Sequence, residues 1–152
     1  MKEEHRKLSK YTGGIYRCTQ AFTSEILKPF GLSSGCCSYL LTLNNNDGMN
    51  QNQISRELNV DKAMSARELK KLIQKGYVKK EADKNDTRAY KLSLTDQGRR
   101  IIPEIHRELS IWNNAITSGL EEKEKEELLR MLDVVLQEAR RLRSVQKEEW
   151  RS

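Results

Sequence analysis

The middle third of the chain, residues 50–94, contains two helix starts in close succession. Asn50 and Asp61 are each suited to cap the first turn of a helix, because their side-chain oxygens can accept a free backbone N–H. Asn59 lies between them, and asparagine tolerates the left-handed conformation that a tight turn between helices needs. We therefore expect two short helices that meet at a sharp turn, the second covering 62–75.

Two strands are predicted directly after this helix pair, at 77–82 and 89–94. A tyrosine and two leucines alternate with polar residues in the second, as a half-buried strand requires. The connection at 83–88 reads DKNDTR, which is polar and rich in turn formers. Two helices, a tight turn and a hairpin indicate a winged helix-turn-helix, a fold that is mainly α with a small β-hairpin wing (α+β).

Helices are also predicted on both sides of this segment. Periodic apolar residues place them over 6–29, 34–44, 96–118 and 121–145. Pro29 should end the first, because the residue before a proline resists helical dihedrals. The hydroxyls of Ser33 and Thr95 are suited to cap the second and third helices.

The positive charge of the chain is concentrated in the same middle third. The net charge is +6, and residues 50–94 carry 11 basic and 6 acidic side chains, whereas 95–152 carry 11 and 12. A cluster of positive charge on one segment favours a polyanionic partner such as nucleic acid.

Several other classes of protein are excluded by what the sequence lacks. The longest apolar run is three residues, so we expect no membrane span and no membrane partner, and the charged N-terminus does not resemble a signal peptide. These features predict a cytoplasmic protein. Three cysteines do not form a disulfide framework, and no metal-ligand spacing or local enzyme motif is present. We expect no metal, no cofactor and no catalytic activity.

The second short helix is predicted to enter the major groove of DNA. With Ser65, Leu69 and Leu72 facing inward, the opposite half of this helix carries three cations and no acid. Small side chains there allow close approach to base edges, and an arginine can bridge two acceptors of guanine. The predicted base-reading residues are Ala63, Met64 and Arg67, and the predicted phosphate contacts are Lys62, Lys70, Lys71 and Lys84. The alternative is an ordinary solvated basic face.

The tip of the hairpin supplies a second predicted contact. Arg88 is suited to the narrow minor groove, where the negative potential is focused. Asp86 would be repelled by phosphate, so we expect its carboxylate to hold Arg88 through a charge-assisted hydrogen bond. The alternative is an exposed pair of little energetic value.

The run VDKAMSARELKKLIQKGYVKKEADKNDTRAYKLSLTDQGRRIIPEI resembles the MarR-type transcriptional regulators, and the resemblance covers essentially the whole chain. It rests on the D-x-R of the wing (Asp86, Arg88) followed by L-T-x-x-G at 94–98. The resemblance implies a winged-helix homodimer that represses genes and is released from DNA by a small aromatic or anionic effector or by thiol oxidation. The family often has an apolar residue where this chain has Ser65, whose hydroxyl needs a partner; a backbone carbonyl one turn back is a candidate.

Dimerisation also follows from the apolar stripes in the last two predicted helices, which would otherwise be exposed. By role we divide the chain into 1–32 (dimerisation), 33–95 (DNA binding) and 96–152 (a long helix and a second dimerisation helix). The predicted interface residues are Leu8, Ile15, Ile105, Leu109, Leu128, Leu132 and Val135. Two-fold pairing would place two recognition helices about 34 Å apart and match a pseudo-palindromic operator in double-stranded DNA.

Two further hypotheses stay open. The first is a regulator on the same scaffold that is switched by thiol oxidation, for which Cys36 is expected to be more exposed than Cys18 and Cys37, both predicted to be buried and inert. The second is a winged-helix protein-interaction module without DNA binding, against which the basic outer face of 62–75 argues.

Overall fold

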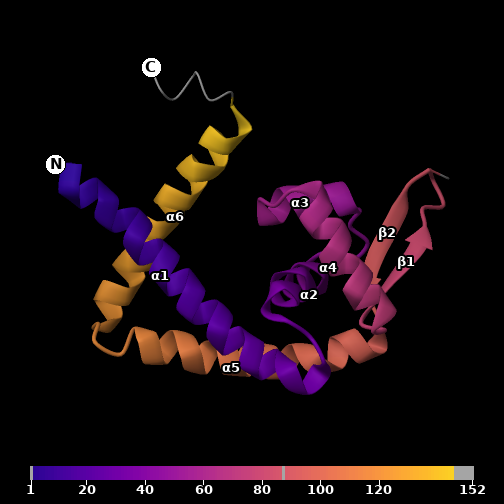
Figure 1. Ribbon diagram of the computed structural model, residues 1–152, viewed down its shortest axis with the longest axis horizontal. Coiled ribbons are helices and arrows are strands. Elements are labelled where there is room, and N and C mark those ends of the chain that lie inside the picture. The colour runs from indigo at the N-terminus through magenta and orange to yellow at the C-terminus, as the bar shows by residue number, and fades with distance from the viewer. Residues whose placement is uncertain (1, 87, 146–152) are drawn as a thin grey trace. The chain divides into compact units, whose positions relative to one another are not determined.

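The computed structural model describes residues 2–86 and 88–145. These residues form helices α1 to α6, the short 3₁₀ helices η1 and η2, and strands β1 and β2 (Figure 1). The chain divides into two compact units, Met1–Trp112 and Asn113–Ser152. The fold is mainly α with one antiparallel hairpin, as predicted. Of the predicted C-terminal segment, 146–152 lies outside the described residues.

Helix α1 (Lys2–Leu27) begins earlier and ends earlier than the predicted range of 6–29. Pro29 does not terminate it directly, because the chain first tightens into the 3₁₀ helix η1 (Lys28–Phe30). Gly31 then adopts a left-handed φ of 68° and its N–H bonds the Lys28 carbonyl. Glycine favours this conformation because it has no Cβ to clash with the backbone.

The second predicted helix begins as a 3₁₀ turn, η2 (Ser34–Cys36), and continues as α2 (Cys37–Asn45). The Ser33 hydroxyl makes no capping hydrogen bond, so its predicted role as a side-chain cap is wrong. The Ser33 carbonyl instead accepts the Cys36 N–H at 3.0 Å, because the chain closes a tight turn before the α-helix begins.

The two short helices, α3 (Gln51–Leu58) and α4 (Lys62–Gln74), form as predicted. The Asn50 side chain accepts the Gln53 N–H in a capping box, and the Asp61 side chain accepts the Met64 N–H at the start of α4. Asn59 has a φ of 54°, which confirms the left-handed turn between the helices.

The hairpin consists of β1 (Val78–Ala82) and β2 (Tyr90–Leu94), which pair antiparallel with Val78 opposite Leu94. Leu92 and Leu94 are buried, but Tyr90 is half exposed because it lies toward the tip of the hairpin. The other edge of β2 pairs with Met49 through an isolated antiparallel bridge at Leu92. Figure 1 shows the hairpin beside α4 and the bundle of α2, α3 and α4.

Helix α5 (Asp96–Ile116) follows the hairpin and is capped by Thr95, as predicted. The Thr95 hydroxyl accepts the Gly98 N–H at 3.1 Å and donates to the Gly76 carbonyl at 2.6 Å. Gly98 is required here, because a Cβ would lie 2.2 Å from the Tyr77 carbonyl oxygen. This close approach seats the start of α5 against the turn between α4 and β1.

Helix α1 is tied to α5 through aromatic side chains of the first unit. The Trp112 indole stacks on Phe22 with ring centroids 4.7 Å apart, and its N–H donates to the Thr19 hydroxyl at 3.0 Å. Helix α6 (Glu122–Ser144) belongs to the second unit, and none of its described residues is buried.

The hydrophobic core lies within the first unit and joins α1, α2, α3, α4, the hairpin and the first half of α5. Its fully buried members include Leu27, Leu40, Leu43, Ile54, Leu72, Leu94 and Ile105. This core holds α3 and α4 in a fixed position relative to the hairpin, which is the geometry that the candidate site needs.

Candidate nucleic-acid interface

Helix α4 separates into a buried face and an exposed face, as the helical wheel predicted. Ser65, Leu69 and Leu72 are buried against the core. The exposed residues include all six predicted contacts on this helix: Lys62, Ala63, Met64, Arg67, Lys70 and Lys71, together with Ala66 and Gln74. The basic side of α4 is therefore free to meet a ligand in the isolated chain.

The buried hydroxyl of Ser65 finds its partners on neighbouring helices. Ser55 of α3 donates to Ser65 Oγ at 2.8 Å, and the Tyr39 hydroxyl of α2 lies 3.4 Å from the same atom. The predicted bond to a backbone carbonyl one turn back is therefore wrong, because two side-chain hydroxyls lie within reach. Burial raises the pKa of Tyr39, so its hydroxyl stays protonated. These contacts fix the rotation of α4 against α2 and α3.

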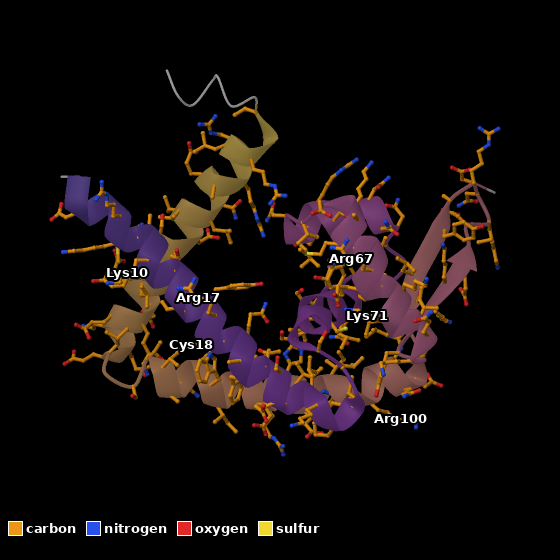
Figure 2. The ribbon with its side chains drawn as sticks, in the orientation of Figure 1. Lys10, Arg17, Cys18, Arg67, Lys71 and Arg100 are labelled. Carbon is orange, nitrogen blue, oxygen red and sulfur yellow. The ribbon has the colours of Figure 1, made fainter. Side chains whose placement is uncertain are left out.

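Arg67 lies near the middle of the exposed face of α4 (Figure 2). Its guanidinium forms no ion pair with any described residue. Its neighbour one turn earlier is Ala63, whose small methyl group projects only a short distance from the helix. An unpaired arginine beside small side chains can approach an acceptor pair closely.

The wing tip is ordered by its aspartates in a way that differs from the prediction. Asp86 Oδ1 accepts the backbone N–H of Arg88 at 3.0 Å, whereas the guanidinium of Arg88 makes no ion pair among residues 2–86 and 88–145. The predicted carboxylate–guanidinium bond is therefore wrong, because the short Asp86 side chain closes a local turn with the main chain. Lys84 and Arg88 are exposed. The carboxylate shapes the tip and leaves Arg88 free.

A groove of about 720 Å³ lies between α3, α4 and the hairpin. Three cations reach it, Lys70 from α4 and Lys80 and Arg88 from the hairpin, and no acidic residue lines it. Lys80 Nζ lies 4.2 Å from the ring centroid of Tyr90. The groove therefore continues the positive face of α4 toward the wing.

The opposite edge of α4 carries an acid, Glu68, that is not among the predicted site residues. Glu68 Oε1 lies 3.0 Å from Lys71 Nζ, and Glu68 Oε2 accepts the thiol proton of Cys36 at 3.3 Å. The spacing of three residues between Glu68 and Lys71 is a sequence signal for such an ion pair. The contact with Cys36, from a residue 32 positions away, has no comparable signal.

The burial of two of the three cysteines differs from the prediction. Cys18 is exposed although it was expected to be buried, and Cys36 is buried although it was expected to be the more exposed candidate. The 3₁₀ turn at η2 changes the helical phase, which explains why a simple wheel misplaced Cys36. Cys37 is buried, as predicted, and burial raises its pKa to about 11.

Four of the predicted interface residues lie on the surface of the single chain: Leu8, Ile15, Leu132 and Val135. Leu109 and Leu128 are partly buried. Ile105 is 1% exposed within the core of its own unit, so it has no surface to offer a second subunit and its assignment to an interface is wrong. Ile105 lies on the predicted apolar stripe of its helix, but this position is buried in the core of the first unit rather than exposed to solvent.

No helix in the described part of the chain is long and apolar enough to cross a membrane. Among the same residues, no group of three or more His, Cys, Asp or Glu side chains could hold a metal ion.

The sequence profile of the MarR family matches residues 32–90, the segment that holds η2, the bundle and most of the hairpin. The HTH-type transcriptional regulator BilQ of Clostridioides difficile (strain CD3) is 33% identical over 132 residues, which are 87% of this chain and 89% of that protein. The chain belongs to the MarR family. It is thus a transcriptional regulator rather than an enzyme. A second relative, YybA of Bacillus subtilis (strain 168), is described as an uncharacterised HTH-type transcriptional regulator and is 28% identical over 79% of this chain and 80% of its own length.

Solved structures of MarR-family proteins share this fold. A regulator from Methanosarcina mazei Go1 matches with a TM-score of 0.86 at 28% identity, covering 90% of this chain and 99% of that one. A Listeria monocytogenes regulator, crystallised with a 26mer DNA, matches with a TM-score of 0.84 at 25% identity over 88% of this chain and 89% of its own.

Proposed function

We propose that this MarR-family regulator binds a pseudo-palindromic operator in double-stranded DNA as a homodimer and represses transcription until a small aromatic or anionic effector releases it. The observation that carries the proposal is the exposed face of α4, where Arg67 stands without an ion-pair partner among the described residues, one turn from Ala63. The Listeria regulator crystallised with DNA, which has the same fold, supports this choice of ligand.

Each contact has a separate role in the proposal. Arg67, with Ala63 and Met64, reads base edges in the major groove. Lys62, Lys70, Lys71 and Lys84 contact phosphates, and Arg88 enters the minor groove at the wing while Asp86 shapes the tip. The groove between α4 and the hairpin supports this assignment, because Lys70 from α4 and Arg88 from the wing both line it.

The dimer is supported by the apolar side chains that a single chain leaves exposed. On α1 they include Leu8 and Ile15, and on α6 they include Leu129, Leu132 and Val135. Monomeric soluble proteins rarely expose contiguous apolar patches larger than a few hundred Å². A two-fold pair would bury these side chains and set the spacing of the two recognition helices.

The base-reading role of Arg67 is tested with an operator selected from fragments of the source genome at physiological salt. Arg67→Ala should weaken operator binding by about 1–3 kcal/mol and relax specificity at one base position, because a bidentate contact to one base pair is lost. Fluorescence anisotropy over a salt series measures both effects. Arg56→Ala, which removes another exposed arginine from α3, is the matched control.

An unchanged operator affinity in Arg67→Ala would contradict the assignment. A wild-type protein that shows no salt-dependent binding to any DNA would instead favour the protein-interaction module.

A thiol-switched regulator is the second candidate, and the exposure of Cys18 supports this residue as its switch. This thiol is exposed in the isolated chain, whereas Cys36 and Cys37 are buried. Peroxide should then abolish operator binding in the wild type and leave Cys18→Ser unaffected. Equal loss of binding in both proteins would exclude Cys18 as the switch.

A further inference from the structure

The two lysines that follow one another on α4 stand in different electrostatic surroundings. Lys70 lines the groove toward the hairpin and makes no ion pair with the described residues. Lys71 lies on the other edge, where its ammonium is 3.0 Å from Glu68 Oε1. Figure 2 shows Lys71 on α4 together with Arg67. Both lysines were predicted to contact phosphates, but only Lys71 forms an ion pair within the described residues.

The carboxylate of Glu68 is held in place by contacts with η2. Its side chain is 15% exposed, and Oε2 accepts the thiol proton of Cys36, a residue that is 1% exposed. A Cβ on Gly35 would lie 3.1 Å from the same carboxylate, so the absence of a side chain there leaves room for it. Burial raises the pKa of Cys36, and so the thiol stays protonated and remains a donor.

This arrangement leaves Glu68 with little freedom. One oxygen is bonded to a buried thiol and the other to the exposed ammonium of Lys71. An ordinary surface pair loses side-chain entropy when it forms, because both partners are mobile. Here one partner is already fixed by the fold, so the pair places the ammonium at a defined point on the edge of α4.

We propose that Glu68 is a positioning residue of the DNA interface, which holds Lys71 in a neutral carboxylate–ammonium pair at the η2 edge of α4. The inference rests on the proposed function, because it takes this face of α4 to meet DNA. Lys71 then contributes a directed hydrogen bond to one phosphate but little net charge. The effect is to favour DNA in the correct register over attraction to any polyanion, since net charge drives non-specific binding.

The test measures the slope of the logarithm of the binding constant against the logarithm of salt concentration on a random-sequence duplex. Each unpaired cation that neutralises a phosphate contributes about 0.9 to this slope in B-form DNA. We expect Lys70→Ala to flatten the slope by about 0.9 and Lys71→Ala to change it by less than about 0.3. Glu68→Gln should steepen it by about 0.9, because it releases the charge of Lys71.

The double variant Glu68→Gln/Lys71→Ala separates pairing from a simple change of net charge. In the Glu68→Gln background, Lys71→Ala should now flatten the slope by about 0.9, so that the double variant returns close to the wild type. If charges act independently, Lys71→Ala has the same effect in both backgrounds, and that result would overturn the proposal. Glu57→Gln removes an exposed acid of α3 and is the matched charge control.

The hydrogen bond between Cys36 of η2 and Glu68 is tested with two substitutions of Cys36. Cys36→Ser keeps a donor to Glu68 and should leave the slope at the wild-type value, whereas Cys36→Ala should move it toward that of Glu68→Gln. Equal slopes in the two variants would show that the thiol does not hold the carboxylate. Circular dichroism and thermal unfolding confirm that each variant is folded before its slope is compared.

Failure of the underlying function gives a different result. If Lys70→Ala, Lys71→Ala and Arg67→Ala all leave the slope unchanged, the face of α4 does not meet DNA and the proposed function fails. If Lys70→Ala flattens the slope while Lys71→Ala does so equally, only the role of Glu68 fails.

Discussion

The winged-helix segment and helix α6 use their apolar residues in opposite ways. The segment buries Ile54, Leu69 and Leu72 within its own core. Helix α6 exposes Leu129, Met131, Leu132, Val134, Val135 and Leu136, and none of its described residues is buried. The first region therefore gains stability from apolar contacts within one chain, whereas the second leaves its apolar side chains exposed, where the proposed dimer would cover them. The comparison predicts that substitutions in the two regions differ in how their effects depend on protein concentration.

The largest effect is expected in the winged-helix core. Leu72→Ala removes a side chain that is 0% exposed and leaves a cavity between α4 and its neighbours. It should lower the free energy of unfolding by about 2–5 kcal/mol. Denaturant unfolding followed by circular dichroism at two protein concentrations measures the change. A loss that vanishes at high concentration would show that this core also depends on the partner subunit.

A smaller effect is expected in α6, and it should appear in assembly rather than in the core. Leu132→Asp places a charge on the exposed apolar stripe and should raise the dimer dissociation constant at least tenfold, about 1.4 kcal/mol. Sedimentation equilibrium measures this constant. Gln137→Asp introduces the same charge at an exposed polar position of α6 and is the control. A monomeric wild type, or equal effects of the two variants, would contradict the proposed interface.

The smallest effect concerns a single helix cap of the winged-helix segment. Asn50→Ala removes the side-chain oxygen that accepts the Gln53 N–H at 2.9 Å, and it should cost about 1 kcal/mol of stability. Ser33→Ala is the matched control, because Ser33 precedes a helix but its hydroxyl makes no capping bond. Equal losses in the two variants would show that the cap at Asn50 contributes little. Thermal unfolding at one protein concentration is sufficient for this comparison.

Much of the fold was predictable because its signals are local. The caps at Asn50, Asp61 and Thr95 each join atoms three residues apart, and the left-handed turn at Asn59 depends on that residue alone. Such interactions form within one turn of chain, so residue type and spacing are enough to place them. The same reasoning explains why the exposed and buried sides of α4 were assigned correctly.

The wrong predictions concern contacts between segments that are distant in sequence, or positions where the phase of a helix changes locally. Ser33 does not cap, because the chain enters α2 through a 3₁₀ turn, and this turn also moves Cys36 into the core. Ile105 lies on the predicted stripe, but packing within its own unit buries it. The bond of Asp86 goes to a main-chain N–H rather than to a guanidinium, since the tight wing turn brings that group closer.

By itself, the sequence determined the order of helices and strands, the basic face of α4 and the membership of the MarR family. Periodicity, capping residues and charge are properties of short stretches of sequence, and they can be recognised without knowledge of the tertiary structure. Only the tertiary structure decided that Glu68 joins Cys36 to Lys71 and that Tyr39 and Ser55 meet Ser65. Apart from the pair of Glu68 and Lys71 within α4, these contacts join residues from different helical segments, and their geometry depends on how the whole core packs.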